Sequence, residues 1–400
     1  GADMTATFSQ ATGATITLDS VRPIGNLVFG GSNYILAGGT LALTSTSGIS
    51  TVSVATGTSA FIGSVFTGAS HLNKTGDGTL ILSNTNSYSG ATSVAAGTLW
   101  VASGTSTPVT IANAGFESPV FGAGGWSYSP SGANWSFNGS GCASNGSPWV
   151  NTAPEGMQVG FVQNNGTLTQ SITVTNGGFY DLSFQAANRP NYADSGIAVQ
   201  INSTTVKSWP AGTFASGGGF QTFVVRAVRL EAGSNVLSFA GSQNGADSAT
   251  TIDDVRLTGY PSGSLPTGTA LTLSGGTLRL DVAQTVGSLV GVSGTQLINN
   301  VALTVDFAAT TTFAGVISGT GSLVKDGSGT LTLTGNNTYT GGTTVNGGKL
   351  IVSGSLNNTS SVTIAAGAEL EISGTLTASG NIVNHGTLVL TGAPQLGAGG

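Results

Sequence analysis

The sequence predicts an all-β protein, a right-handed parallel β-solenoid that carries an inserted antiparallel β-sandwich. Three observations support this fold class. The chain of 400 residues contains 64 Gly and only 6% charged residues, yet 39% of it is hydrophobic, unlike a disordered chain. Apolar residues alternate with Thr and Ser, which is the period of a β-strand. Triplets similar to Gly-Thr-Leu return at a constant spacing near both ends of the chain.

The repeat spacing determines how the strands must be arranged. Four repeats begin 19 residues apart, at Gly329, Gly348, Gly367 and Gly386. A unit this short cannot enclose a core, so successive units must stack strand on strand. Crossovers between parallel strands are right-handed, which predicts the hand of the solenoid. Leu side chains are expected inside and Thr outside, with Gly and Asn at the corners, where stacked Asn side chains would bond along the column.

Two long stretches of the chain have closely similar sequences. Residues 74–101 read KTGDGTLILSNTNSYSGATSVAAGTLWV, and residues 325–352 read KDGSGTLTLTGNNTYTGGTTVNGGKLIV. Both resemble the autotransporter-associated β-strand repeat of bacterial surface and secreted proteins. The resemblance implies a β-solenoid and an extracellular or cell-surface location, but no chemistry. Residues 1–106 and 263–400 are therefore either two solenoids or, as we favour, one solenoid with an insert at a corner.

The middle of the chain, residues 107–262, has a different composition. It holds 18 of the 28 aromatic residues and four of the five tryptophans. The 19-residue period is absent, and alternating segments are separated by Gly, Asn and Ser turns. This pattern predicts an antiparallel sandwich of about eight strands.

The ends of this middle segment carry a second resemblance. It opens with IANAGFESP and closes with TTIDDVRL, similar to the galactose-binding-like jelly rolls of carbohydrate-binding modules. That resemblance implies a structural calcium ion between the first and last strands, with Glu117 and either Asp253 or Asp254 as ligands. Strand alternation places only one of the two aspartates inward. The alternative is that these carboxylates are solvated or pair with Arg256.

Sugar binding requires aromatic surfaces and a few polar groups. The candidates are Trp135, Trp149, Arg189, Tyr192 and Trp209. The polar segment 188–192 is the best single candidate, and Trp126 is expected in the core. The alternative is that all the tryptophans fill the sandwich or its contact with the solenoid.

Other functional classes find little support in the sequence. There is no basic stripe for nucleic acid and no apolar run of the roughly 20 residues that a membrane helix needs. No signal peptide is evident, so a secreted chain would be in its mature form. The single cysteine, Cys142, excludes an intrachain disulfide. The paired acids Glu369 and Glu371 read as an outward ladder, and His71 and His385 lack catalytic neighbours, so we expect no enzyme.

These features predict a non-catalytic extracellular structural protein. It would assemble end to end into a fibre, layer or matrix, because the ends of a solenoid expose unpaired strand edges. The expected partners are copies of the same chain, and loss of residues 1–12 should abolish assembly. The alternative is a carbohydrate-binding adhesin in which the solenoid is a spacer and the partner is a polysaccharide. A structural calcium ion is the one cofactor considered.

Overall fold

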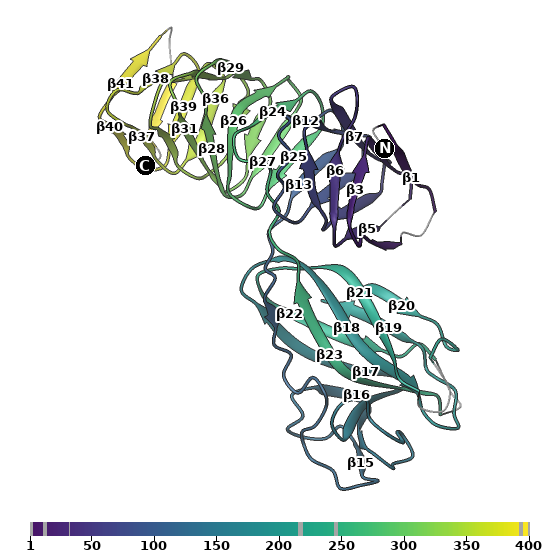
Figure 1. Ribbon diagram of the computed structural model, residues 1–400. Helices are drawn as coiled ribbons and strands as arrows, with labels where there is room; N and C mark the ends of the chain where they lie inside the picture. The colour runs from purple at the N-terminus through teal and green to yellow at the C-terminus, as the bar shows by residue number, and fades with distance from the viewer. Residues whose placement is uncertain are drawn as a thin grey trace. The chain divides into compact units, whose positions relative to one another are not determined.

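The computed structural model describes residues 3–10, 14–31, 33–214, 219–243, 247–391 and 395–398, and it confirms the predicted fold class (Figure 1). The chain forms two compact units, residues 1–103 with 261–400, and residues 104–260. Each unit is described by itself. Within the described residues, no helix has the length and apolarity needed to cross a membrane.

The first unit is a parallel β-solenoid built from four sheets. The largest sheet contains β1 (Thr5–Phe8), β4 (Asn26–Phe29), β7 (Ile49–Val54), β10 (His71–Thr75), β12 (Thr92–Val94), β24 (Thr269–Leu273), β26 (Gln284–Gly291), β28 (Ala302–Asp306), β29 (Thr310–Phe313), β31 (Ser322–Asp326), β32 (Thr330–Leu333), β34 (Thr343–Val345), β35 (Lys349–Val352), β37 (Val362–Ile364), β38 (Glu369–Ile372), β40 (Ile382–Asn384) and β41 (Thr387–Leu390). The second contains β2 (Thr15–Thr17), β5 (Tyr34–Ala37), β8 (Ser59–Ile62), β11 (Thr79–Leu82), β13 (Thr98–Val101), β25 (Thr277–Leu280), β27 (Gln296–Asn299) and β30 (Val316–Ser318). Two smaller sheets contain β3 (Val21–Ile24), β6 (Thr40–Leu43) and β9 (Val65–Gly68), and β33 (Asn336–Asn337), β36 (Ser355–Thr359), β39 (Thr375–Ala378) and β42 (Gln395–Ala398).

The strand register stacks identical side chains in columns. Leu331, Leu350 and Leu370 face one another on β32, β35 and β38, and all three are fully buried. The outward column beside them includes Ile351 and Glu371. Alternation of inward Leu with outward residues, Thr332 and Glu371 among them, is therefore the source of the solenoid core, as the period-2 pattern predicts.

The solenoid is continuous across the insert. Strand β12 pairs directly with β24, and β13 pairs with β25, so strands on opposite sides of the insert are neighbours in one ladder (Figure 1). The backbone N–H of Gly263 donates to the carbonyl of Ala102 at 2.8 Å. The inserted unit therefore adds no rung to the stack.

The insert occupies the place of a single corner. In the second long repeat, Asn336 pairs with Ser355, and only Ser353 and Gly354 separate β35 from β36. The equivalent bridge in the first repeat joins Thr85 to Ser264. The same corner thus accepts either two residues or an entire folded unit.

The repeat lysines are buried and donate hydrogen bonds at the corners of the solenoid. Lys74 Nζ donates to the carbonyls of Thr75 at 2.9 Å, Gly76 at 2.7 Å and Ala96 at 3.1 Å. In the second repeat, Lys325 Nζ makes three equivalent bonds, to the carbonyls of residues 326, 327 and 347. Burial lowers the pKa of Lys74 to about 8, and the nearby Asp77 opposes part of that effect. The lysine satisfies carbonyls that turn inward where the chain bends.

The repeat asparagines bridge neighbouring rungs. Asn337 Oδ1 accepts from the backbone N–H of Ile317 at 2.9 Å, and its Nδ2 donates to Ser355 O at 3.1 Å. Asn86 makes the matching bonds to Phe66 N and Ser264 O. Each Asn therefore bonds to the backbone of the rungs above and below it, because its amide supplies both a donor and an acceptor. The expected bonding along the column takes this form.

A tyrosine and a threonine complete the buried polar set of each repeat. Tyr88 and Thr92 share a hydrogen bond of 2.6 Å between their hydroxyls, and Tyr339 and Thr343 share one of 2.7 Å. Thr92 also lies 3.3 Å from Thr269, on the far side of the insert. The polar residues that recur in the two repeats therefore form hydrogen bonds inside the solenoid.

The second unit is an antiparallel sandwich whose strands belong to one branched sheet. Its strands are β14 (Pro108–Val109), β15 (Trp126–Tyr128), β16 (Ser136–Ser144), β17 (Gln158–Val174), β18 (Gly178–Asn188), β19 (Ile197–Ile201), β20 (Thr204–Trp209), β21 (Gln221–Leu230), β22 (Gly233–Ala240) and β23 (Ala249–Gly259). The first part of β17 pairs with β23 and its second part with β22, so the sheet folds over on itself. The main core lies between the two layers, where Phe184 of β18 meets Phe239 of β22.

We expect Lys325→Met to destabilise the solenoid, because three inward carbonyls lose their donor. An unsatisfied buried group costs about 1–3 kcal/mol, so the thermal transition of the solenoid should fall by several degrees. Lys349→Met is the matched control, since Lys349 forms outward, partly exposed ion pairs with Glu369 and Glu371. Equal melting temperatures for the two variants, measured by circular dichroism, would contradict the role assigned to Lys325.

Candidate ligand-binding site

A small apolar cluster lies apart from the main core of the second unit. Trp149 is its centre, with only 2% of its surface exposed. Its ring stacks on Phe161 of β17, with centroids 3.8 Å apart and planes 14° from parallel. Trp126 and Tyr128 of β15 each contact Trp149 with centroids 5.8 Å away, and both are exposed by more than 40%. An aromatic surface therefore rests on a buried tryptophan.

Arg189 is buried beside this cluster with its guanidinium between two rings. Its Cζ lies 4.1 Å from the Trp149 centroid and 3.8 Å from that of Tyr192. Its Nε donates to the carbonyl of Pro148 at 3.2 Å, and its Nη1 lies 3.0 Å from Asp247 Oδ2. Two cation–π contacts therefore hold the guanidinium against the rings of Trp149 and Tyr192.

A chain of polar contacts leads back from this arginine to the exposed aromatic residues. Asp247 accepts a hydrogen bond from Gln163 Nε2, and Gln163 Oε1 accepts one from the Tyr128 hydroxyl. Burial raises the pKa of Tyr128, and the negative charge of Asp247 raises it further. Tyr128, Gln163 and Asp247 thus connect the two ends of the aromatic surface.

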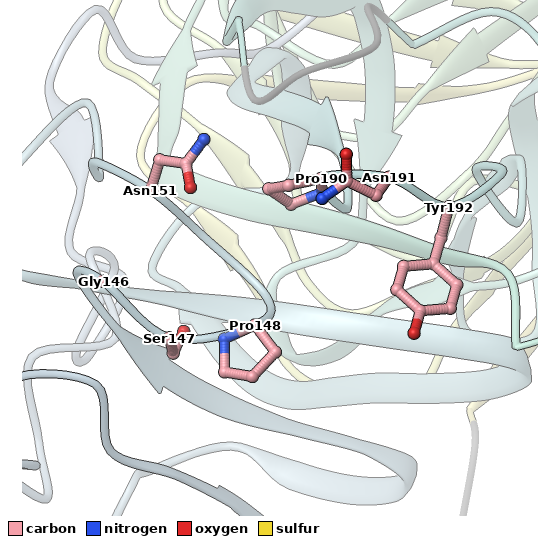
Figure 2. Close-up of a pocket in the computed structure, with 7 residues that line it drawn as sticks. All are labelled: Gly146, Ser147, Pro148, Asn151, Pro190, Asn191 and Tyr192. Atoms are coloured by element: carbon pink, nitrogen blue, oxygen red, sulfur yellow. The ribbon is translucent and has the colours of Figure 1, made fainter.

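A pocket of about 670 Å³ opens next to Arg189 and Trp149. It is lined by two separate segments, Gly146, Ser147, Pro148 and Asn151 from one, and Pro190, Asn191 and Tyr192 from the other. Figure 2 shows that the amides of the two asparagines, the prolines and the Tyr192 ring surround it. The lining combines flat apolar faces with hydroxyl and amide groups, as carbohydrate sites do.

Three buried side-chain atoms of this region have no hydrogen-bond partner among the described residues. They are Trp149 Nε1, Asn188 Oδ1 and Arg189 Nη1. Such atoms are uncommon in folded proteins, and each of them calls for an explanation. The contact between Arg189 Nη1 and Asp247 is close enough for an ion pair but does not have the direction of a hydrogen bond.

The structure brings three of the five predicted ligand residues together and leaves two elsewhere. Arg189 contacts both Trp149 and Tyr192, and of these three residues only Tyr192 lines the pocket. Trp135 lies in the core, 5% exposed, stacked on Phe116 with its Nε1 bonded to the Asn113 carbonyl at 3.0 Å. Trp209 ends β20 and packs edge-on against core phenylalanines of β18 and β21. Neither tryptophan presents a free face at the pocket.

Trp126 was expected in the core, and this expectation is wrong. It is 44% exposed and sits on the short strand β15 above Trp149. The spacing Trp-Ser-Tyr places Trp126 and Tyr128 on one side of a strand, a signal that was available in the sequence. Asp247 and Gln163 carried no such signal, because only the fold brings Asp247 to Arg189 and Gln163 to Asp247.

The acidic candidates for a calcium site have different partners in the structure. Asp253 is fully buried, whereas Asp254 turns outward and pairs with Arg256 at 2.7 Å, which is the alternative stated for it. Glu117 Oε1 accepts two backbone N–H groups, from Met157 and Gln158, each at 2.8 Å. No three Asp, Glu, His or Cys side chains in the described ranges lie together as a metal-binding group.

A carboxylate that the sequence analysis overlooked lies beside Asp253. A Cβ added to Gly115 would come within 2.0 Å of Glu155 Oε2 and 3.5 Å of Asp253 Oδ1, so both acids border the same glycine. Burial raises the pKa of Asp253 to about 8, against the effect of the Asp254 and Glu155 amides that bond to it. Without a cation, this carboxyl group therefore holds its proton at neutral pH.

The groups set aside as catalytic candidates have structural partners. Cys142 is buried, and burial raises the pKa of its thiol to about 12, which keeps it protonated. His71 Nδ1 accepts the backbone N–H of Ala91 at 2.8 Å, a bond between rungs. Glu369 and Glu371 both pair with Lys349 on the outer face, as the outward ladder predicts.

Comparisons with known families match the two units separately. Residues 72–101 and 323–352 match the passenger-associated-transport-repeat family, and residues 107–258 match the family described as HpiC1 cyclase. The chain is 40% identical over 97 residues to the adhesin BmaC autotransporter of Brucella suis biovar 1 (strain 1330). That match covers 24% of this chain and 3% of the adhesin.

Among solved structures, the second unit is similar to a Stig cyclase FisC from Fischerella sp. TAU, with 19% identity and a TM-score of 0.34, over 40% of this chain and 100% of that chain. A family 35 carbohydrate-binding module from Clostridium thermocellum is 17% identical, with a TM-score of 0.24, over 31% of this chain and 90% of that one. Neither structural likeness carries a functional argument. The repeats are autotransporter-associated repeats in a β-solenoid, which confirms the resemblance seen in residues 74–101 and 325–352.

Proposed function

We propose that this chain belongs to a bacterial surface protein of the adhesin type, in which the second unit binds a polysaccharide and the solenoid is its support. The pocket beside Arg189 is the observation that carries the proposal. It combines the exposed ring of Tyr192, two prolines and two asparagine amides in one concave surface. Sugar rings pack on flat apolar faces and exchange hydrogen bonds with amides, so this lining suits them.

The solenoid supports the same proposal from the other unit. Its repeats match a family named for the transport of passenger segments, and its similarity to an autotransporter adhesin favours an extracellular or surface location. The chain spans only 3% of that adhesin, so the activity of the adhesin is proposed here rather than transferred. A stack of rungs that accepts an insert at one corner is suited to presenting a folded module.

We propose a binding role rather than catalysis for the second unit, although its family match is to cyclases. The acid with the strongly raised pKa, Asp253, is fully buried and does not line the pocket. A general acid must reach the atom that it protonates. Turnover of a polysaccharide by the pure chain would overturn the non-catalytic proposal.

Calcium binding remains a prediction, now centred on Asp253 and Glu155. Carboxylate oxygens are the right donors, but calcium takes six to eight oxygens, so backbone carbonyls would have to supply the rest. The ion would replace the proton held by Asp253 and join β23 to the segment around Glu155. Its effect would be structural.

End-to-end assembly also remains a prediction. Ile382, Val383 and Leu390 on β40 and β41 are each about 40% exposed or more, in positions where earlier rungs bury their counterparts or cover them with a neighbour. Such a surface could accept a further strand layer. Residues 1, 2, 11 and 12 of the segment proposed for deletion lie outside the described residues.

Tyr192→Ala should weaken polysaccharide binding about tenfold, because it removes a face of the pocket and one ring from Arg189. Tyr192→Phe is the matched control, since it retains the ring, and it should bind within about threefold of the parent. Binding to a glycan array, followed by titration calorimetry on the positive glycans, measures both. Full binding by the alanine variant would exclude this pocket.

Calcium should raise the melting temperature of the second unit, and Asp253→Asn should remove that response. Without calcium the variant should unfold near the parent temperature at pH 7, because Asn mimics the protonated acid. Glu117→Gln discriminates between the two carboxylate sets and should keep the response. A calcium response that survives in Asp253→Asn would place the ion elsewhere.

Negative-stain electron microscopy of the purified chain tests assembly. Filaments or sheets that disappear when residues 1–12 are removed would support the end-to-end contact. Isolated particles at all concentrations would contradict it and leave the adhesin proposal standing alone.

A further inference from the structure

One corner of the second long repeat combines an exposed asparagine with a glycine. Asn346 and Gly347 lie between β34 and β35, outside both strands, and Asn346 is exposed. The first repeat has Ala95 and Ala96 in these two positions. The backbone N–H groups of Asn346 and Ala95 each donate to the carbonyl of the repeat lysine at 2.9 Å. The two corners therefore share this backbone bond and differ in their side chains.

The two groups that would join in a ring closure are both free at this corner. Among the described residues, neither the side-chain amide of Asn346 nor the backbone N–H of Gly347 has a hydrogen-bond partner. Glycine carries no Cβ, so its nitrogen can approach the preceding side chain with little steric hindrance. A nucleophilic nitrogen and an amide carbon are therefore adjacent, and neither group is engaged elsewhere.

We propose that Asn346 is a site of spontaneous deamidation. The Gly347 nitrogen loses its proton and attacks Cγ of Asn346, the bond from Cγ to Nδ2 breaks, and ammonia leaves. The product is a five-membered succinimide. Water, the only co-reactant, then adds to one of the two carbonyl carbons and breaks the bond from that carbon to the Gly347 nitrogen. Opening at Cγ gives aspartate, and opening at the backbone carbonyl gives isoaspartate, in which the main chain runs through the side chain.

The isoaspartate product weakens the hydrogen bonding of the corner. It lengthens the main chain by one carbon atom directly before Gly347, whose carbonyl accepts from Lys325 Nζ at 3.3 Å, the longest of the three bonds of that lysine. Displacing this carbonyl leaves the buried ammonium group with two acceptors, which lowers stability. The first repeat has no amide at this place, so it keeps its three bonds.

The test is incubation of the full chain at neutral and at mildly alkaline pH, followed by peptide mass spectrometry. We expect the peptide that contains Asn346 to gain the mass of one deamidation and to accept a methyl group from an isoaspartyl methyltransferase. The reaction should be faster at the higher pH, because the attacking nitrogen must lose its proton.

Gly347→Ala is the matched variant, and it should slow the reaction about tenfold or more, because the added Cβ hinders ring closure. That Cβ would lie 3.1 Å from the Gly327 carbonyl oxygen, and Ala96 occupies the equivalent place in the first repeat, so the variant should fold. The melting temperature of the parent solenoid should fall during incubation, and that of Gly347→Ala should not. An unchanged deamidation rate in Gly347→Ala would overturn the proposal.

Asn145 and Gly146 provide a control within the same chain, because they are the same dipeptide with both groups engaged. Asn145 Oδ1 accepts the N–H of Ala153 at 2.6 Å, and the N–H of Gly146 donates to the carbonyl of Asn151 at 3.1 Å. Both bonds must break before a ring can close, so this pair should react roughly tenfold more slowly than Asn346 in the folded chain.

Urea separates the effect of the fold from that of the local sequence. In the unfolded chain Asn145 and Asn346 should react at similar rates, because neither is then held by the structure. Equal rates in the folded chain, or a difference that persists unchanged in urea, would overturn the assignment of the site from the structure. Deamidation of Asn346 with no fall in melting temperature would overturn the effect assigned to the Lys325 bond.

Discussion

Every rung of the solenoid depends on backbone hydrogen bonds to the rung on either side. Along the strands of a parallel stack, the hydrogen-bond ladder pairs each backbone N–H with a C=O. The corners are different, because the chain bends inward there and its carbonyls face a dry core. The ammonium groups of Lys74 and Lys325 each donate three hydrogen bonds to these carbonyls. Asn86 and Asn337 form hydrogen bonds to the adjacent rungs. The polar residues of the repeat thus stabilise the solenoid, as its leucines do.

The same ladder explains how the chain tolerates an insert of this size. Because β12 and β13 pair directly with β24 and β25, the core columns pass the insertion point unbroken. The Ser83 hydroxyl donates to the Pro261 carbonyl at 2.6 Å, so the chain re-enters the stack beside the rung that it left. An insertion whose two ends meet at one corner adds mainly loop-closure entropy, which grows slowly with length. The solenoid therefore constrains where a module is attached and leaves its identity free.

The candidate site in the second unit is built by loops and individual strands, and not by repeated strands. Its residues come from β15, the loop before β17, β17 itself, the segment after β18 and the segment before β23, and none of them lies in the main core. Trp149 can be both buried and part of the site because Phe161 supports it from the sheet. Arg189 is held by contacts with the rings of Trp149 and Tyr192, by the bond from its Nε to the Pro148 carbonyl and by the ion pair with Asp247.

How much was predictable depends on the range of the interactions. The β-solenoid followed from local periods, because Leu331 and Leu333 face inward by alternation and the 19-residue step leaves stacking as the only way to bury them. The sequence likewise indicated that a sandwich interrupts the stack and that Trp149, Arg189 and Tyr192 are chemically suited to a ligand. Only the tertiary structure decided that these three meet while Trp135 and Trp209 pack inside, and that Glu155 borders Asp253. It also brought Asp247 to Arg189, because contacts between loops 58 residues apart in sequence arise from strand pairing and leave no periodic trace.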